Sequence, residues 1–342
     1  MAGPTISVLF LRHIVNCFEL TGRPRAPMLA EFGLHPSLLD DREATIPLAQ
    51  FLQLLEHAAR CSANPHFGLQ SGRLAGSDSL GPLSFLFLSA PTLGDAFRSF
   101  VRYLDTMQQG VRNAFAVESG RAMFEYSILD PSFGMRRQDA EYSIGATYTL
   151  AKNYCGGQLE LAEVCFEHPR AVAYSRYRDF FNCDVFFEQP RNSITFDAAI
   201  LNQPGKILSA DLFPILVDHL QRKAAAQCDP ADLLGMLENW LASADISRPL
   251  GLEDGALAVG CSPKKIQRHL SQRGATWRGL LHKRRIAAAE RLLLESHRSV
   301  ADVALATGYA ESASFIRAFK AASGMTPARY RADRGGSARR IP

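Results

Sequence analysis

The stretch Asp254-Gly-Ala-Leu-Ala-Val-Gly260 returns further along the 342-residue chain as Asp302-Val-Ala-Leu-Ala-Thr-Gly308. The similarity continues downstream, where Gly274-Ala-Thr-Trp277 corresponds to Gly324-Met-Thr-Pro327. The offset between the copies grows only from 48 residues at the first pair to 50 at the second. Because a repeated local pattern indicates a repeated structural unit, the chain is expected to fold one supersecondary motif twice.

Each copy has the pattern of two helices joined by a tight turn. The first helix is short, rich in alanine, and ends at Gly260 or Gly308, and glycine adopts the left-handed backbone of such a turn at little cost. In the first copy Ser262-Pro263 supplies an N-cap and a first helical residue for the second helix. These features predict two helix-turn-helix units, at residues 252–273 and 299–322.

The second helix of each unit has an apolar side and a polar side. Ile266 and Leu270 in the first copy, like Phe315 and Phe319 in the second, are spaced to face the core. The residues expected to contact DNA are Lys264, Lys265, Gln267, Arg268 and Ser271 in the first helix and Ser312, Ala313, Ser314, Arg317 and Lys320 in the second. Gln can pair with adenine and Arg or Lys with guanine in a major groove, each worth about 1–3 kcal/mol of discrimination. A solvated helix face explains one such stripe equally well.

The segment between the two units sets their separation. Residues 276–295 have leucine, isoleucine and alanine at helical spacing, no proline, and no glycine after Gly279. A helix of this length is about 30 Å long, and successive major-groove segments on one face of DNA lie about 34 Å apart. Two reading helices held in this way suit double-stranded DNA, which is the expected partner.

Charge is divided unevenly along the chain. Residues 261–342 contain 17 lysines and arginines against 5 acidic residues, whereas residues 1–260 contain 21 against 29. The C-terminal segment therefore has a net charge of +12 and the remainder −8, which together give the +4 of the whole chain. A basic segment attached to an acidic body is typical of a nucleic-acid-binding domain joined to a domain of another kind.

Four stretches of the C-terminal part form a recognisable pattern. They are Arg285-Ile-Ala-Ala-Ala-Glu-Arg-Leu-Leu293, Val300-Ala-Asp-Val-Ala-Leu-Ala-Thr-Gly-Tyr309, Ser314-Phe-Ile-Arg-Ala-Phe-Lys320 and Gly324-Met-Thr-Pro-Ala-Arg-Tyr-Arg331. This pattern resembles the DNA-binding domain of the AraC/XylS family of bacterial transcription regulators. The resemblance implies an all-α domain of seven helices, two helix-turn-helix units included, at residues 231–332.

In that family the third and sixth helices enter the major groove. Carried over, these are the helices at residues 262–272 and 312–322, and the base-contacting positions are those of Lys264, Gln267, Arg268, Ser314 and Arg317. One departure is Gly255, where the family usually has a branched apolar residue, as Val303 is in the second copy. Since glycine inside a helix costs about 0.5–1 kcal/mol, we expect the substitution Gly255→Val to raise the melting temperature.

The N-terminal part mixes helix and strand patterns. Helices are expected from Thr45-Ile-Pro47, after Thr92, and over residues 139–154 and 209–226, and strands over residues 111–118, 121–128, 159–167, 183–189 and 193–197. Ser119-Gly120 between the first two strands indicates a hairpin. The mixture predicts an α+β domain, followed by the all-α domain described above.

Four further stretches lie in this part: Gly33-Leu-His-Pro-Ser-Leu-Leu39, Gly81-Pro-Leu-Ser-Phe-Leu-Phe-Leu-Ser-Ala-Pro-Thr-Leu-Gly94, Phe180-Phe-Asn-Cys-Asp-Val-Phe-Phe187 and Phe196-Asp-Ala-Ala-Ile-Leu201. They are similar to the sensor domain, called arabinose-binding-like, that often precedes an AraC-type DNA-binding domain. The similarity implies a pocket for a small organic effector and formation of a homodimer. Candidates for lining the pocket, with core packing as their alternative role, are Phe85, Phe87, Phe97, Phe100, Tyr103 and Tyr142.

These patterns divide the chain into five parts. They are an N-terminal segment at residues 1–21, an effector-sensing and dimerisation domain at 22–205, a linker helix at 206–230, the DNA-binding domain at 231–332 and a basic tail at 333–342. The helical pattern over residues 209–226 ends near Asp229-Pro230, which favours a boundary at that point.

Motifs of several other protein classes are missing. We find no GxSxG, GxxxxGK[ST] or HExxH, and no GxGxxG after a strand, so neither an enzyme nor a cofactor is expected. His13 with Cys17, and Cys165 with His168, offer only two metal ligands each, and packing is their more common role. Seven scattered cysteines without CxxC indicate thiols in a reducing cytoplasm. No apolar run reaches the length of about 18 residues that a membrane span needs.

The sequence thus predicts a cytoplasmic, sequence-specific DNA-binding transcription regulator under the control of a small effector. RNA polymerase is a further expected partner if the protein activates transcription. The alternative is a non-specific architectural or RNA-binding protein that uses only the basic C-terminal domain.

Overall fold

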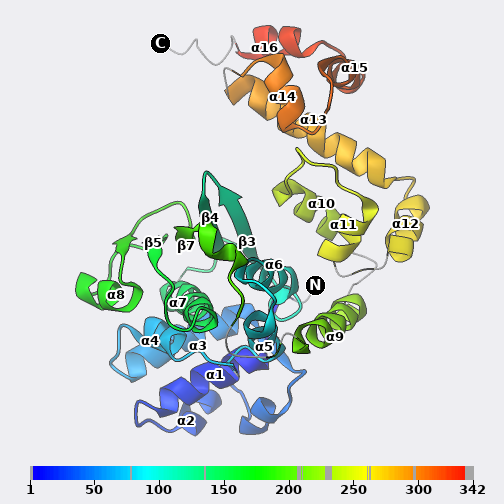
Figure 1. Ribbon diagram of the computed structural model, residues 1–342. Helices are drawn as coiled ribbons and strands as arrows, with labels where there is room; N and C mark the ends of the chain where they lie inside the picture. The colour runs from blue at the N-terminus through cyan, green and yellow to red at the C-terminus, as the bar shows by residue number, and fades with distance from the viewer. Residues whose placement is uncertain are drawn as a thin grey trace. The chain divides into compact units, whose positions relative to one another are not determined.

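The computed structural model describes residues 3–77, 79–134, 136–205, 209, 211–227, 233–259, 261, 263–295 and 298–335. The chain divides into two compact units, Met1–Gln221 and Arg222–Pro342 (Figure 1). The first unit combines helices with β-sheets, and the described part of the second is helical. The predicted order of an α+β domain followed by an all-α domain is therefore confirmed.

A five-stranded sheet lies in the first unit. Its strands are β3 (Val111–Glu118), β4 (Arg121–Ile128), β5 (Leu161–Cys165), β6 (Asp184–Phe186) and β7 (Asn192–Asp197), in the order β3-β4-β7-β5-β6. Neighbouring strands are antiparallel except for the β5–β6 pair. The predicted hairpin is confirmed, because Ser119 and Gly120 have φ angles of 51° and 77°, the positive values that its two-residue turn requires.

The remaining elements of the first unit are mostly helices. They are α1 (Val8–Glu19), α2 (Arg25–Glu31), α3 (Leu48–Cys61), α4 (Phe67–Arg73), α5 (Pro82–Ser89), α6 (Leu93–Leu104), α7 (Arg137–Tyr154) and α8 (Tyr174–Phe181), with 3-10 turns at Pro36–Asp40 and Ala198–Asn202. The predicted N-cap of α6 is confirmed, since the Thr92 hydroxyl accepts a hydrogen bond from the Asp95 amide. The expected helix start at Thr45 is wrong: β2 (Thr45–Pro47) pairs with β1 (Thr5–Ser7), and α3 begins at Leu48.

Helix α9 (Leu212–Gln227) follows the sheet-containing part of the chain. Leu220 is fully buried in the core of the first unit, and Phe213, Leu216 and Val217 pack against that core. Ile215 points away and is 63% exposed. The N-terminal part of α9 thus belongs to the first unit by its packing.

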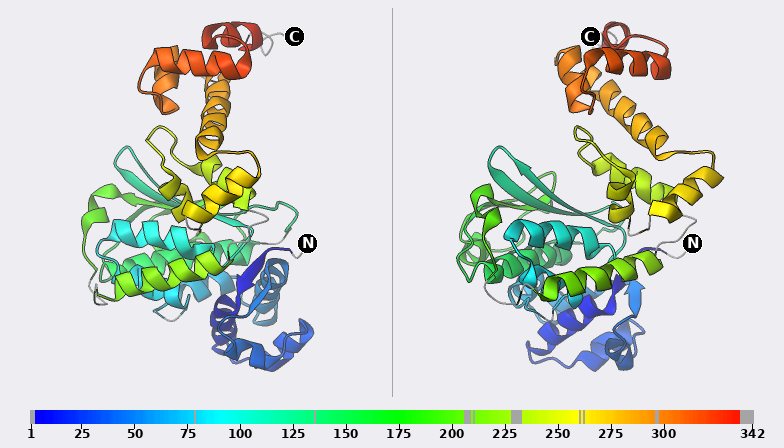
Figure 2. Two further views of the ribbon diagram at one scale, coloured as in Figure 1. Left: turned by 90° about the vertical axis from the view of Figure 1, so that its right-hand side faces the viewer. Right: turned by 45° about the vertical axis from the view of Figure 1, so that its right-hand side comes forward.

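After α9, the described residues of the second unit form the seven helices expected from the family resemblance. They are α10 (Leu233–Ser243), α11 (Leu252–Ala258), α12 (Pro263–Gln272), α13 (Trp277–Glu295), α14 (Val300–Ala306), α15 (Ser312–Ser323) and α16 (Pro327–Gly335). The helices form two separate hydrophobic cores, one around α10 to α12 and one around α14 to α16. Helix α13, drawn from yellow to orange in Figure 2, runs between the two groups of helices.

Both cores include side chains of α13. Leu280 and Ala288 are buried in the first core, whereas Ile286, Ala289 and Leu293 are buried in the second. One continuous helix of 19 residues therefore fixes the distance and the orientation between the two halves of the second unit.

Among the described residues, Cys17, Cys61, Cys155, Cys165 and Cys183 form no disulfide bond. Cys261 is disulfide-bonded, so the expectation of thiols is wrong at this position. The described residues include no cluster of three or more His, Cys, Asp and Glu side chains suited to a metal ion. In the same residues, no helix combines the length and the apolar character needed to cross a membrane.

The expectation that Gly255→Val stabilises the protein is contradicted by the packing of α11. A Cβ atom on Gly255 would lie 2.5 Å from Cη2 and 2.6 Å from Cζ3 of Trp277. The indole ring cannot easily move, because its Nε1 donates to the Leu250 carbonyl at 3.2 Å and it stacks on Trp240 at 6.0 Å between ring centroids. The tryptophan thus occupies the space of the missing branched side chain.

We therefore predict that Gly255→Val lowers the stability of the second unit. The added methyl groups collide with the Trp277 ring, and overpacking of this kind costs about 1–3 kcal/mol. Thermal unfolding of the full chain, followed at the transition of the helical unit, measures the effect. In the double variant Gly255→Val/Trp277→Leu the loss should be smaller than the sum of the two single losses. An unchanged or higher melting temperature for Gly255→Val alone would contradict this prediction.

Candidate nucleic-acid interface

The repeated aspartates begin the first helix of each helix-turn-helix unit. At α14 the Ser299 amide donates to the Asp302 carboxylate at 3.2 Å, and the Asp302 amide donates to the Ser299 hydroxyl at 3.1 Å. At α11 the Gly251 amide donates to the Asp254 carboxylate at 2.7 Å. Each carboxylate pairs an amide at the helix start and complements the helix dipole. The first residue of the sequence repeat therefore has the same structural role in both copies.

The turn of the second helix-turn-helix unit requires glycine for two reasons. Gly308 has a φ of 78°, and a Cβ there would overlap the Ile246 carbonyl and the Arg285 guanidinium. Gly260 and Ser262, expected at the corresponding turn of the first helix-turn-helix unit, lie outside the described residues.

Helix α12 has the apolar and polar sides expected from the sequence. Ile266 and Leu270 are buried in the first core. Lys264, Gln267, Arg268 and Ser271 are exposed, and Lys265 is half-buried. The long polar side chains of α12 thus point to solvent, while its apolar side packs in the first core of the second unit.

Helix α15 repeats this arrangement with fewer polar side chains. Phe315 and Phe319 are fully buried, with Phe319 packed edge-on against Tyr330 of α16. Ala313, Arg317 and Lys320 are exposed, and Ser312 and Ser314 are half-buried. The Arg317 guanidinium donates to the Ser314 hydroxyl at 3.2 Å, which places these two side chains together.

The exposed cations of both helices carry uncompensated charge within the described structure. None of Lys264, Arg268, Arg317 and Lys320 forms an ion pair with a described residue. Their positive charge is therefore directed to solvent, where phosphate and base edges of a nucleic acid can approach. Most of the basic tail, including Arg339 and Arg340, lies outside the described residues.

Two arginines attach helix α13 to neighbouring segments, a role that the sequence did not indicate. Arg284 donates to the carbonyls of Leu241 and Ala242 at the end of α10, both at 2.8 Å. The guanidinium of Arg331 on α16 donates to the Leu293 carbonyl at 3.1 Å and to the Arg298 carbonyl at 2.6 Å. Carbonyls near the ends of helices lack a partner within the helix, so these arginines pair groups that would otherwise remain open.

Arg285 contacts both halves of the second unit. Its guanidinium donates to the carbonyls of Ile246 and Arg248, each at 3.3 Å, in the loop before α11. The same group lies 5.7 Å from the ring centroid of Tyr309, directly after the turn of the second helix-turn-helix unit. A movement of one half relative to the other would therefore break the contacts of Arg285 with one of them.

A small cavity lies in the core of the first unit, with a volume of about 20 Å³. Of the six aromatic residues expected around an effector, Phe100 and Tyr142 line it and the other four do not. Phe87 and Phe97 pack edge-on against each other in the core, Tyr103 is buried beside Arg102, and Phe85 is half-buried on α5. The further lining residues are Phe10, Leu80, Leu104, Gln108, Asn113, Phe124, Tyr126, Ser143, Ala146 and Thr147.

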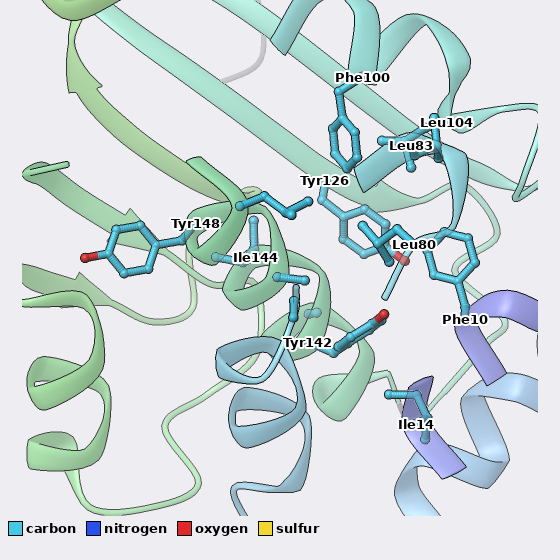
Figure 3. Close-up of a cluster of buried hydrophobic side chains, with 14 of the residues drawn as sticks. Phe10, Ile14, Leu80, Leu83, Phe100, Leu104, Tyr126, Tyr142, Ile144 and Tyr148 are labelled. Atoms are coloured by element: carbon cyan, nitrogen blue, oxygen red, sulfur yellow. The ribbon is translucent and has the colours of Figure 1, made fainter. Parts of the chain in front are cut away.

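Two polar groups in the wall of this cavity have no partner among the described residues. They are the Tyr142 hydroxyl and the Asn113 Nδ2. Tyr142 is only 2% exposed, and Figure 3 shows its ring beside Leu80 and Phe10. A buried donor without a partner costs about 1–3 kcal/mol. The sequence did not identify Asn113 as a cavity residue, because a single polar residue within a predicted strand gives no indication that its side chain lines a cavity.

Known proteins match both units. A family model described as the N-terminal arabinose-binding domain of AraC transcription regulators matches residues 22–205, and a helix-turn-helix domain model matches residues 256–333. The HTH-type transcriptional regulator VirS of Mycobacterium tuberculosis is 25% identical over 345 residues, covering 98% of this chain and 99% of its own. The ornithine utilization regulator of Pseudomonas aeruginosa is 23% identical over 329 residues, with coverage of 95% and 96%.

A solved structure is also similar, that of the transcriptional regulator CdpR from Pseudomonas aeruginosa. It covers 94% of this chain and 98% of its own, with a TM-score of 0.45 and 19% identity. The matched families and relatives are transcription regulators and not enzymes, in agreement with the sequence prediction. Since the sensor-domain match spans more than half of the chain and a helix-turn-helix match follows it, the chain belongs to the AraC family of DNA-binding transcription regulators.

Proposed function

We propose that this regulator reads two successive major-groove segments with α12 and α15, and that a small molecule bound to the first unit controls the reading. The observation that carries the proposal is the pair of outward cationic faces attached to the two ends of α13, each held by its own core. A helix of 19 residues is about 28 Å long. That length is close to the separation of about 34 Å between successive groove segments on one DNA face.

The two reading helices differ in what they can recognise. On α12, Gln267 suits adenine and Arg268 or Lys264 suits guanine. On α15 the one strong base reader is Arg317, while Ala313 suits a thymine methyl group and Ser314 a base or a phosphate. We therefore assign most of the sequence discrimination to the first helix-turn-helix unit.

We predict that Arg268→Ala relaxes base preference at one position of the binding site. Loss of a bidentate contact to guanine should cost about 1–3 kcal/mol of discrimination. Selection of bound duplexes from a random pool, with the full-length protein, measures the preference at each base pair. Lys283→Ala is the matched control, because Lys283 is 81% exposed on α13 and belongs to neither reading helix.

The same experiment separates the proposal from non-specific binding. Specific reading requires a ratio of specific to random affinity of at least about 10³. If the wild-type protein shows no preferred sequence, or if Arg268→Ala and Lys283→Ala weaken binding equally on all duplexes, the architectural or RNA-binding alternative holds instead.

The cavity beside Tyr142 supports the assignment of an effector site to the first unit. Aromatic rings surround the cavity, and no ionised side chain lines it. The Tyr142 hydroxyl and the side-chain amide of Asn113 are donors without a partner among the described residues. This chemistry suits a small neutral molecule with an apolar body and one hydrogen-bond acceptor. A volume of about 20 Å³ holds roughly one water molecule, so a larger effector would bind by moving the surrounding rings apart.

We predict that Tyr142→Phe removes the response to such an effector without unfolding the protein. The variant keeps the ring and deletes an unpaired buried hydroxyl, so the unfolding free energy should stay constant or rise by about 1 kcal/mol. The thermal shift caused by a panel of small neutral alcohols, ketones and amides measures binding. Tyr148→Phe is the matched control, since Tyr148 lies on the same helix but points away from the cavity toward Phe180 and Phe181 (Figure 3).

A compound that stabilises the wild type and Tyr148→Phe, but much less Tyr142→Phe, would support this site. Equal stabilisation of all three proteins would place the effector elsewhere, and no stabilisation by any compound would contradict the proposed site. One relative is named as a regulator of ornithine utilization, and its link to the metabolism of a small molecule supports effector control here. We further propose a homodimer as the regulatory form, and contact with RNA polymerase if the protein activates transcription.

A further inference from the structure

Strand β3 lies at one edge of the five-stranded sheet and has a free side. Its hairpin places Glu118 opposite Arg121 on either side of the two-residue turn, so the even-numbered residues of β3 exchange hydrogen bonds with β4. The amides and carbonyls of Val111, Asn113, Phe115 and Val117 therefore point away from the sheet. None of them bonds to any backbone group in the described part of the chain.

This edge has few of the features that usually protect an edge strand; its two charged residues, Arg112 and Glu118, are opposite in sign. Natural edges are short, bulged, or carry lysine or proline. β3 has eight residues, neither lysine nor proline, and an unbroken register with β4. The opposite edge, β6, has only three residues. A long regular edge such as β3 suits pairing with another strand.

We propose that β3 pairs in antiparallel fashion with β3 of a second copy of this chain, around a two-fold axis at Phe115. The two sheets then form one continuous sheet. The inference names the surface of the homodimer proposed above and rests on that proposal. It commits to a second copy because the strand is complementary to itself in charge.

Charge selects one register among those in which the free backbone groups meet. With Phe115 opposite Phe115 of the second copy, Arg112 faces the partner's Glu118 at both ends of the paired segment. These two residues then form non-hydrogen-bonded pairs, in which side chains of opposing strands are closest. A shift by two residues in one direction sets Arg112 opposite the partner's Ala116 and Glu118 opposite the partner's Gly110. The same shift in the other direction sets Glu118 opposite the partner's Ala114 and Arg112 opposite the partner's Gly120, so both shifts lose the two opposite-charge pairs.

Packing on the inner face of the sheet agrees with this register. The Phe115 ring stacks on Phe97 of α6, with centroids 4.8 Å apart and planes 7° from parallel. Phe115 remains half-buried because no strand lies beyond it, and Val117 is 49% exposed. A paired β3 would cover the open side of the phenylalanine stack and part of Val117. On the opposite face of the sheet, Ala114 would face the partner's Ala116 on either side of the Phe115 pair, and these small side chains leave room for the two strands.

Reversal of the two charges tests the pairing in the full-length protein. Arg112→Glu and Glu118→Arg each create two like-charge pairs per dimer, and we expect each to raise the dimer dissociation constant roughly ten-fold or more. The double variant Arg112→Glu/Glu118→Arg restores opposite charges and should return the constant to within about three-fold of wild type. Sedimentation velocity over a range of protein concentrations measures it. Arg23→Glu, an equal charge change at an exposed residue of the first unit, is the control and should leave the constant unchanged.

Hydrogen exchange gives a second, independent measure. The amides of Asn113, Phe115 and Val117 should exchange more slowly in the wild-type dimer than in the dilute monomer, whereas those of β4 should not change. Circular dichroism melts identify any variant that loses its fold.

The outcomes separate this surface from the dimer itself. A protein that stays monomeric at all concentrations would overturn both the surface and the proposed homodimer. A dimer that neither single reversal weakens, or that the double variant fails to rescue, would overturn pairing through β3 and favour another contact, such as the exposed Ile215 side of α9. The DNA-reading experiments on Arg268 do not depend on either result.

Discussion

The participation of one helix in two hydrophobic cores is the constraint on which the second unit depends. Leu280 and Ala288 of α13 belong to the first core, and Ile286, Ala289 and Leu293 to the second. The contributions overlap along the helix, so neither half can turn about α13 without exposing apolar side chains of its own core. Burial of a leucine-sized side chain is worth about 1.5–3 kcal/mol. The spacing of α12 and α15 is therefore maintained by the same burial that folds each half.

Polar contacts strengthen this constraint at the places where burial cannot act. The carbonyls at the end of α10 and near the end of α13 are paired by Arg284 and Arg331. Arg285 joins the loop before α11 to the ring of Tyr309 in the other half. Because these arginines are used within the domain, its basic composition is not simply a measure of DNA contact. The basic residues of the C-terminal segment thus fall into two groups: arginines that hydrogen-bond within the domain around α13, and cations that face solvent.

Sequence periodicity predicted the elements whose causes are local. The hairpin at Ser119-Gly120, the N-cap at Thr92 and the long helix α13 follow from turn chemistry, capping and helical spacing, which neighbouring residues determine. The expectation of seven helices in the second unit came from the family resemblance and not from periodicity. The strand at Thr45–Pro47 was missed because its partner, Thr5–Ser7, lies forty residues away and only pairing makes it a strand. The cavity lining was largely missed for the same reason: it draws on α1, α6, α7, β3 and β4, and no spacing in the sequence shows that these segments meet.

The two halves of the second unit also show how one repeated sequence fills its core in two ways. In the second half Val303 is fully buried at the position where the first half has Gly255. In the first half, the Trp277 ring from the start of α13 occupies the space that a side chain at position 255 would fill. The ring also bonds to Leu250 and stacks on Trp240, so a single side chain of the rod contacts α10, α11 and the loop between them. The glycine that looked like a local weakness is the condition for this contact, and the orientation of the first helix-turn-helix unit relative to α13 depends on it.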